Sequence, residues 1–227
     1  MNLFVKRFSL LLFLPALAVL LGMAPPKKKV IFLGDSITYA GDLEGGYIRM
    51  MRDTLQHNGS DDRYELVGKG VGGNKIRDLL ARIETDVIQQ QPDIVFLMIG
   101  INDVGFFTWQ PTVGGTFPDQ YELGLSYIVK RLQEKHISVI LCTPTIIGEK
   151  KHGSNPMDKQ LDQYAAIMQK VAKKNGTLFC NIRKVFIDTL KTINPNNQQK
   201  GILTVDNVHM NEKGNKLIAE TFLPFLK

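Results

Sequence analysis

The sequence predicts a single three-layer α/β domain built on about five parallel strands. Apolar runs without alternation, such as "DIVFLMIG" and "ISVILC", are typical of strands that are covered by helices on both faces. These runs alternate along the chain with helical patterns, the order that produces parallel βαβ units. No internal repeat and no linker rich in Pro, Gly or Ser divides residues 25–227.

The strands and helices can be placed from these patterns. In a parallel sheet of this kind, ligands bind beyond the carboxyl ends of the strands, so the residues that follow each strand are the candidates for function. Strands are expected at Val30–Gly34, Tyr64–Gly68, Ile94–Gly100, Ser138–Pro144 and Thr177–Ile182. Helices are expected at about 47–58, 75–90, 119–135, 159–174 and 212–226.

Composition limits the classes of partner. A chain of 227 residues with 44% hydrophobic and 22% charged residues is an ordinary globular protein rather than a disordered one. The net charge of +6 comes without an aromatic-interleaved basic stripe or a nucleic-acid motif, so no nucleic-acid partner is expected. Cys142 and Cys180 fall in strand-like runs and are expected to be buried thiols, with a bridge between them as the alternative.

Residues 1–24 have the pattern of an export signal. Lys6 and Arg7 precede a long apolar stretch, and Gly22-Met23-Ala24 resembles a cleavage site with small residues. Pro25 disfavours cleavage there, so an uncleaved membrane anchor is the alternative. No cysteine follows the apolar run, so no lipoprotein anchor is expected. Both alternatives predict an exported domain, periplasmic or secreted, that touches a membrane only through a retained N-terminal segment.

A serine stands where the first strand ends. In "VIFLGDSIT" the apolar run meets Gly34, Asp35 and Ser36 directly. A tight turn would explain Gly34 and Asp35, because both residue types tolerate such backbone geometry. A nucleophilic serine at the functional edge of the sheet would explain all three residues, with Asp35 shaping the turn.

A histidine with a neighbouring acid precedes the last helix. In "DNVH", Asp206 lies three residues before His209, and an acid that fixes the tautomer of a histidine prepares it to act as a general base. The alternative for such a pair is that Asp206 caps a turn and His209 begins a helix. His57 and His136 end helical stretches, and His152 lies in a polar loop. Only His209 combines a close acid in the sequence with a position near the edge that carries the serine.

Two further strand ends offer donors for an oxyanion. Gly72 and Gly73 precede a helix that holds Asn74 and Lys75 in its first turn, and exposed amides at such a turn can bind negative charge. Asn102 follows the third strand, where an amide can donate to an oxyanion or simply cap a turn. Together these groups satisfy the requirements for acyl transfer.

Four short blocks in order resemble those of the SGNH (GDSL-type) hydrolase superfamily. They are "GDSIT", "GVGGNKIRDLL", "GIND" and "DNVH", and the resemblance covers residues 30–226. It implies a flavodoxin-like strand order and an ester hydrolase that needs no metal or other cofactor. It also implies Ser36 as nucleophile, His209 as base and Asp206 as its orienter.

The same resemblance implies the oxyanion hole. The donors would be the backbone N–H groups of Ser36 and Gly73 and the side-chain amide of Asn102. The chain has "GKGVGG" where many relatives carry Asn before the glycines, so Gly72 stays open as the alternative to Gly73.

Two other classes of function compete with a serine esterase. A metal-dependent phosphoesterase could use oxygen and imidazole ligands from Asp35, Asp103, Asp206 and His209. A non-catalytic binding module could retain the fold without the activity.

The substrate is the least determined part of the prediction. The connection 104–118 holds an aromatic cluster at the functional edge, either as a binding loop or as a small satellite core: Phe106, Phe107, Trp109 and Phe117. Trp109 could stack on a sugar ring or line an acyl pocket. Export favours O-acylated carbohydrate, with acetyl as the candidate acyl group, and lipid acyl esters or thioesters are the alternative.

Overall fold

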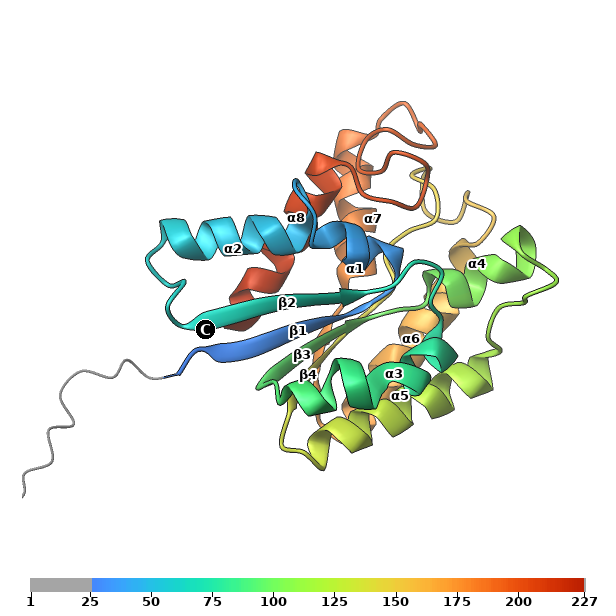
Figure 1. Cartoon of the computed structure of the whole chain (residues 1–227). Helices are drawn as coiled ribbons and strands as arrows, with labels where there is room; N and C mark the ends of the chain where they lie inside the picture. The colour runs from blue at the N-terminus through green and yellow to red at the C-terminus, as the bar shows by residue number, and fades with distance from the viewer. Residues whose placement is uncertain (1–25, 227) are drawn as a thin grey trace, which may run out of the picture.

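The computed structural model describes residues 26–226 and contains one five-stranded sheet whose strands are all parallel (Figure 1). The strand order is β2-β1-β3-β4-β5, which confirms both the predicted fold class and the flavodoxin-like order. The strands are β1 (Lys28–Gly34), β2 (Tyr64–Gly70), β3 (Ile94–Met98), β4 (Ser138–Cys142) and β5 (Leu178–Cys180). β3, β4 and β5 are shorter than predicted: β3 ends at Met98, β4 ends at Cys142, and β5 runs from Leu178 to Cys180 because Ile182 already begins the next helix.

Helices cover both faces of the sheet. α2 (Tyr47–His57) and α8 (Glu212–Phe222) pack together on one face, and α3 (Ile76–Asp86), α5 (Pro118–Gln133) and α6 (Asp158–Asn175) cover the other (Figure 1). Each of these helices was expected from the sequence. The stretch predicted as one helix at 75–90 ends at Asp86 and continues as the 3₁₀ turn η1 (Ile88–Gln90), and α8 is followed by η2 (Leu223–Leu226).

Three further helices were not predicted. They are α1 (Ser36–Gly41), α4 (Ile101–Trp109) and α7 (Ile182–Ile193). α1 and α4 begin directly after β1 and β3, at the carboxyl edge of the sheet. The connection 104–118, predicted as a long loop, is therefore helical as far as Trp109.

An aromatic stack joins the sheet to the last helix. The ring centroids of Phe32 on β1 and Phe96 on β3 are 4.9 Å apart, and those of Phe96 and Phe222 on α8 are 5.0 Å apart. Tyr47 on α2 meets Phe222 edge-on at 5.6 Å. All four side chains are buried, and each contributes roughly 1.5–3 kcal/mol through the hydrophobic effect. This stack fixes β1, β3 and α8 relative to one another.

The two cysteines are neighbours on adjacent strands. Cys142 on β4 and Cys180 on β5 are paired in register, and both are buried and unbridged. Burial, followed by the nearby Cys180 thiol, raises the pKa of Cys142 well above its ordinary value. The expectation of buried thiols is confirmed.

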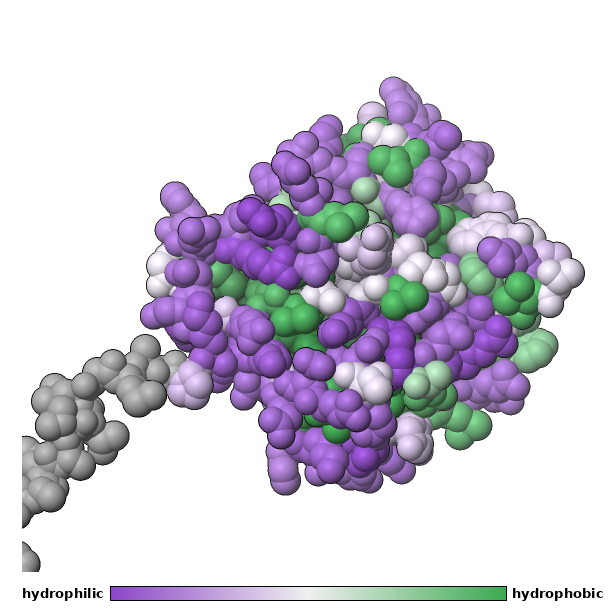
Figure 2. Space-filling view, viewed as in Figure 1, coloured by the Kyte–Doolittle hydropathy of each residue, from purple (hydrophilic) through white to green (hydrophobic). Residues whose placement is uncertain are grey.

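Both ends of the described chain lie at the end of the sheet where the strands begin, opposite the end where they finish (Figure 1). Lys28 opens β1 there, and the hydroxyl of its strand partner Tyr64 donates to the carbonyl of Leu226. The predicted export signal, residues 1–24, lies outside the described residues. Within residues 26–226, no helix is both long enough and apolar enough to cross a membrane. Figure 2 shows a mainly hydrophilic face with scattered apolar patches.

Candidate active site

The turn between β1 and α1 presents Ser36 at the carboxyl edge of the sheet. A Cβ atom on Gly34 would lie 2.2 Å from Oγ1 of Thr38 and 2.6 Å from the Met98 carbonyl oxygen, so only glycine fits there. The Asp35 carboxylate caps α1 by accepting from the Ile37 N–H at 2.9 Å. Asp35 thus shapes the turn, as expected, and Ser36 becomes the first residue of the helix.

His209 connects Ser36 to Asp206. Its Nε2 atom lies 2.9 Å from the Ser36 Oγ atom, and its Nδ1 atom lies 2.7 Å from Oδ2 of Asp206. In the tautomer that satisfies both contacts, Nδ1–H donates to the carboxylate and Nε2 accepts from the serine hydroxyl. The structure therefore brings the three residues, predicted from two separate parts of the chain, into one hydrogen-bonded series.

Asp206 is held ionised by its hydrogen bonds. Partial burial by itself raises the pKa of Asp206, but the His209 ring and the backbone N–H groups of His209 and Val208 outweigh it and lower the pKa below its ordinary value. The two backbone N–H groups donate to Oδ1 at 2.8 and 3.0 Å. The carboxylate can therefore stabilise a positive charge on the imidazole.

Gly73 and Asn102 lie beside Ser36. Gly73 has φ +76°, a left-handed conformation that favours glycine, and it lines the same pocket as Ser36, whereas Gly72 is not part of that lining. The buried Asn102 side chain donates one Nδ2–H to the Asn74 carbonyl at 3.0 Å. Its second N–H can serve another acceptor.

Asp103 ties the two donor segments together. Its buried carboxylate accepts from the Ile76 N–H at 3.0 Å, which joins the start of α3 to α4. Burial raises the pKa of Asp103 to about 6. Beside it, the ammonium of the buried Lys75 lies 4.2 Å from the centre of the Phe106 ring. These contacts join the segment that follows Gly73 to the helix that contains Asn102.

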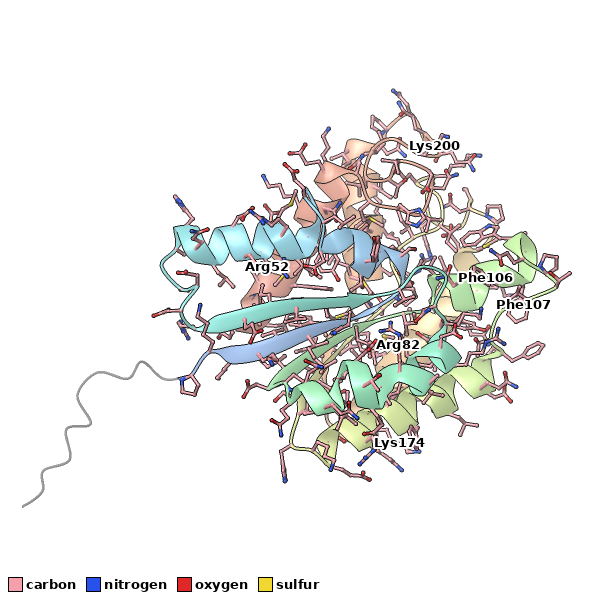
Figure 3. The ribbon with its side chains drawn as sticks, viewed as in Figure 1. Arg52, Arg82, Phe106, Phe107, Lys174 and Lys200 are labelled. Carbon is pink, nitrogen blue, oxygen red and sulfur yellow. The ribbon has the colours of Figure 1, made fainter. Side chains whose placement is uncertain are left out.

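A pocket of about 630 Å³ opens over these groups. Phe106 and Trp109 from α4 line one side, and the 41% exposed Trp109 leaves ring surface available to a substrate. Phe107 and Phe117 pack on each other outside the pocket, with ring centroids 5.2 Å apart. Figure 3 labels Phe106 and Phe107 near the free end of α4. Of the predicted aromatic cluster, two residues therefore line the pocket and the other two pack on each other outside it.

Sequence reasoning missed one pairing in the neighbouring loop. His152 Nε2 lies 2.9 Å from Oδ2 of Asp162, although His152 does not line the pocket that contains Ser36 and His209. Asp162 also accepts from the buried Arg183 at 2.8 Å. Because Asp162 is ten residues from His152, no local spacing pattern indicates the contact.

The residues weighed as metal ligands do not converge. Within residues 26–226, no three His, Cys, Asp or Glu side chains gather in a geometry that could hold a metal ion. Asp35 caps α1 and Asp206 binds His209. The Asp35 carboxylate accepts a backbone N–H, and the Asp206 carboxylate binds the imidazole.

A serine, a histidine and an aspartate in hydrogen-bonded series, with amide donors beside the serine, form the arrangement of a serine hydrolase. Residues 32–217 match the GDSL-like lipase/acylhydrolase family, and the chain belongs to that family. The protein is a carboxylic ester hydrolase.

Known relatives agree with this class. The chain is 34% identical over 209 residues to an acetylxylan esterase of Geobacillus stearothermophilus, covering 86% of this chain and 92% of the relative. The crystal structure of the acetyl xylan esterase AlAXEase superposes with a TM-score of 0.85 at 43% identity, covering 88% of this chain and all of the other. An uncharacterised lipoprotein, YqeF of Bacillus subtilis (strain 168), is 26% identical over 69% of this chain and 71% of its own length.

Proposed function

We propose that this protein removes acyl groups, chiefly acetyl groups, from carbohydrate esters by a serine mechanism. The observation that carries the proposal is the hydrogen-bonded series Ser36–His209–Asp206, with separations of 2.9 and 2.7 Å. In this mechanism Ser36 Oγ attacks the ester carbonyl while His209 Nε2 takes the hydroxyl proton. Asp206 keeps the imidazole in the required tautomer and stabilises its charge.

The proton that His209 took from Ser36 is then transferred to the leaving group. The imidazolium of His209 protonates the departing sugar oxygen as the tetrahedral intermediate collapses to an acyl-serine. Water next attacks the acyl-serine with His209 again as base, which releases the acid and restores the Ser36 hydroxyl. The serine proton thus leaves with the alcohol, and the attacking water supplies the proton that restores Ser36.

The negative oxygen of each tetrahedral intermediate needs preorganised donors. We assign this role to the backbone N–H groups of Ser36 and Gly73 and to the Asn102 amide. The position of Gly73 in the pocket lining favours it over Gly72. The link between Asp103 and Ile76 supports the assignment, because it holds two of the three donors in place.

The choice of carbohydrate rests on the relatives and on Trp109. Two of the relatives are named as acetylxylan esterases. An indole face at the pocket wall offers an apolar surface for a sugar ring, and the pocket of about 630 Å³ accommodates a short acyl group with part of its leaving group.

The substrate class is tested by a panel of esters. Purified enzyme is assayed on acetylated xylo-oligosaccharides and on 4-nitrophenyl esters of two, eight and sixteen carbons. Preference for the acetyl esters and release of acetate from the oligosaccharides support the proposal. Preference for the sixteen-carbon ester would indicate the lipid alternative, and a folded protein without turnover on the whole panel would indicate a binding module.

The mechanism is tested separately from the substrate. A serine-directed organophosphonate should inactivate the enzyme and label Ser36, whereas a chelator should leave the activity unchanged. The reverse pattern would favour a metal-dependent phosphoesterase.

We further propose that the domain is exported. The charge pattern of residues 1–24 and the similarity to a protein named as a lipoprotein support this. Fractionation of the natural host tests it, because full-length protein in the cytoplasmic fraction would contradict export.

A further inference from the structure

We propose that Glu149 is a positioning residue for the active site, and this inference rests on the function proposed above. Its buried carboxylate holds the loop 199–210, which carries Asp206 and His209, in the position that faces Ser36. Glu149 lies in the segment after β4 and touches none of the reacting atoms.

The Glu149 carboxylate is completely buried, with 0% of the residue exposed. Oε1 accepts from the Leu203 N–H at 2.8 Å, from the Thr204 N–H, and from the Thr204 hydroxyl at 2.7 Å. Oε2 accepts from the Ile202 N–H at 2.7 Å. Three consecutive backbone N–H groups therefore converge on one side chain.

The charge of Glu149 explains why the contact is strong. Three successive N–H groups form a concave site for an anion, and here the chain supplies the anion itself. A buried carboxylate is stable only when donors surround it, so moving the loop away would leave the charge without partners. The Glu149 carboxylate and the loop therefore hold each other in place.

The backbone beside Glu149 clamps the same loop at two more points. The Gly148 N–H donates to the Asn207 carbonyl at 2.8 Å, and the Glu149 N–H donates to the Gln199 carbonyl at 2.8 Å. The Glu149 carbonyl in turn accepts from Asn194 Nδ2 at 2.8 Å. Contacts from residues 148–149 thus reach the loop before, within and after the segment that binds the carboxylate.

The loop needs such support because the catalytic side chains are not fixed by burial. The side chains of Asp206 and His209 are 50% and 41% exposed, and no regular helix or strand contains them. Leu203 and Thr204 are the buried part of the segment, and Glu149 binds both of them together with the partly buried Ile202. A displacement of about 1 Å at the reacting groups can lower a rate roughly 10²-fold.

The test uses Glu149→Gln, which keeps the shape of the side chain but turns an amide NH₂ toward N–H donors. We expect kcat on 4-nitrophenyl acetate to fall by about 10- to 100-fold while KM changes by less than about twofold. Labelling of Ser36 by an organophosphonate should slow to a similar degree. Hydrogen–deuterium exchange should increase in residues 199–210 and at the Gly148 and Glu149 N–H groups that donate to them, and remain unchanged in the strands.

Thr204 provides a milder pair of variants. Thr204→Val removes only the hydroxyl donor to Glu149, and we expect a smaller loss of kcat in the same direction. Thr204→Ser keeps that donor and should restore kcat. This pair decides the matter if Glu149→Gln does not fold.

A control separates positioning from stability. Val129→Ala removes buried methyl groups from α5, away from the loop, and should lower the melting temperature without changing kcat. A Glu149→Gln protein that melts early but keeps the wild-type kcat and labelling rate would overturn the inference. Failure of the proposed function is distinct, since it would appear as full activity in Ser36→Ala.

Discussion

The Nε2 atom of His209 lies 2.9 Å from the Oγ atom of Ser36, although 173 positions separate the two residues in the chain. Ser36 is fixed to the end of β1, and His209 lies just before α8. The stack of Phe32, Phe96 and Phe222 packs β1 and β3 against α8 in the interior. The distance between the proposed nucleophile and base is therefore set by the core as well as by the loops.

Replacing Ser36 by alanine should abolish turnover without unfolding the protein. The hydroxyl is the proposed nucleophile, and the turn that presents it depends on Gly34 and Asp35 rather than on the serine side chain. Ester hydrolysis and organophosphonate labelling should both disappear, while the circular dichroism spectrum and melting temperature stay close to wild type. Wild-type rates in this variant would exclude the serine mechanism.

The rate should depend on pH through a single base. Only a neutral imidazole can accept the serine proton, so kcat/KM should rise with pH through the range in which an imidazole loses its proton and then level off. His209→Ala should reduce kcat to near background. The measurement is a pH–rate profile for hydrolysis of an acetyl ester, and a flat profile over that range would remove His209 from the mechanism.

Asn102→Ala separates two roles of one amide. An oxyanion donor binds the charged tetrahedral oxygen better than the ground-state carbonyl, so its loss should lower kcat by roughly 10²–10³-fold with little change in KM. The Asn102 amide also bonds the Asn74 carbonyl, and losing that bond should lower the melting temperature slightly. Steady-state kinetics beside a thermal melt measure both effects. An unchanged kcat with a lower melting temperature would leave only the structural role.

Asp35→Asn should stabilise the protein increasingly as the pH rises. Burial raises the pKa of Asp35 to about 7, whereas an aspartate in the unfolded chain titrates near pH 3.9. Between these values the folded state binds more protons than the unfolded state, so this group lowers the free energy of unfolding as the pH increases. The asparagine does not titrate, and its oxygen can still accept from the Ile37 N–H.

Urea denaturation at several pH values measures this difference. The free energy of unfolding of Asp35→Asn minus that of wild type should grow by up to about 1.4 kcal/mol per pH unit from pH 4 and reach a plateau above pH 7. Asp61→Asn removes an exposed aspartate and serves as the control for net charge. A difference that does not vary with pH would contradict the raised pKa.

Trp109→Ala should weaken binding of carbohydrate but not the chemistry of ester cleavage. Loss of an aromatic face in contact with the sugar should raise KM for acetylated xylo-oligosaccharides by roughly 3- to 10-fold and leave kcat on 4-nitrophenyl acetate near wild type. Phe117→Ala is the matched control, because Phe117 is exposed but outside the pocket. Equal effects of the two variants would argue against a sugar contact at Trp109.

The parallel sheet could be predicted because its strands are continuous apolar runs. Errors arose where other residue types entered an element. Lys28 and Lys29 resemble a loop, yet they extend β1 and pair with Tyr64 and Glu65 on β2. Charged residues fit there because the first two residues of β1 are exposed or half-buried, whereas the rest of the strand is buried.

α4 was missed because its glycines indicate a loop. Gly100 caps the helix with φ +133°, and a Cβ atom on Gly105 would lie 2.2 Å from the Trp109 ring. Gly100 is required by its positive φ and Gly105 by its contact with the Trp109 ring, and neither requirement is visible in the sequence. Trp109 is therefore presented by a helix rather than by a flexible connection.

The candidate residues of the site could be found from the sequence because each follows a strand end or precedes a helix. Their supporting contacts could not be found in this way. Glu149 stands in "GEKK", which resembles an exposed charged loop, and its partners lie more than fifty positions away. Burial of a charge depends on where distant donors converge, and a short sequence pattern does not contain that information.

The position of the chain ends has a practical consequence. β1 spans roughly 20 Å from Lys28 to the turn before Ser36, and Leu226 lies at the Lys28 end. A fusion partner, an affinity tag or a covalent link to a bead can therefore be joined next to Lys28 or next to Leu226 without obstructing the pocket. An enzyme immobilised in this way would present its open side to insoluble material, where a polymeric substrate can reach it.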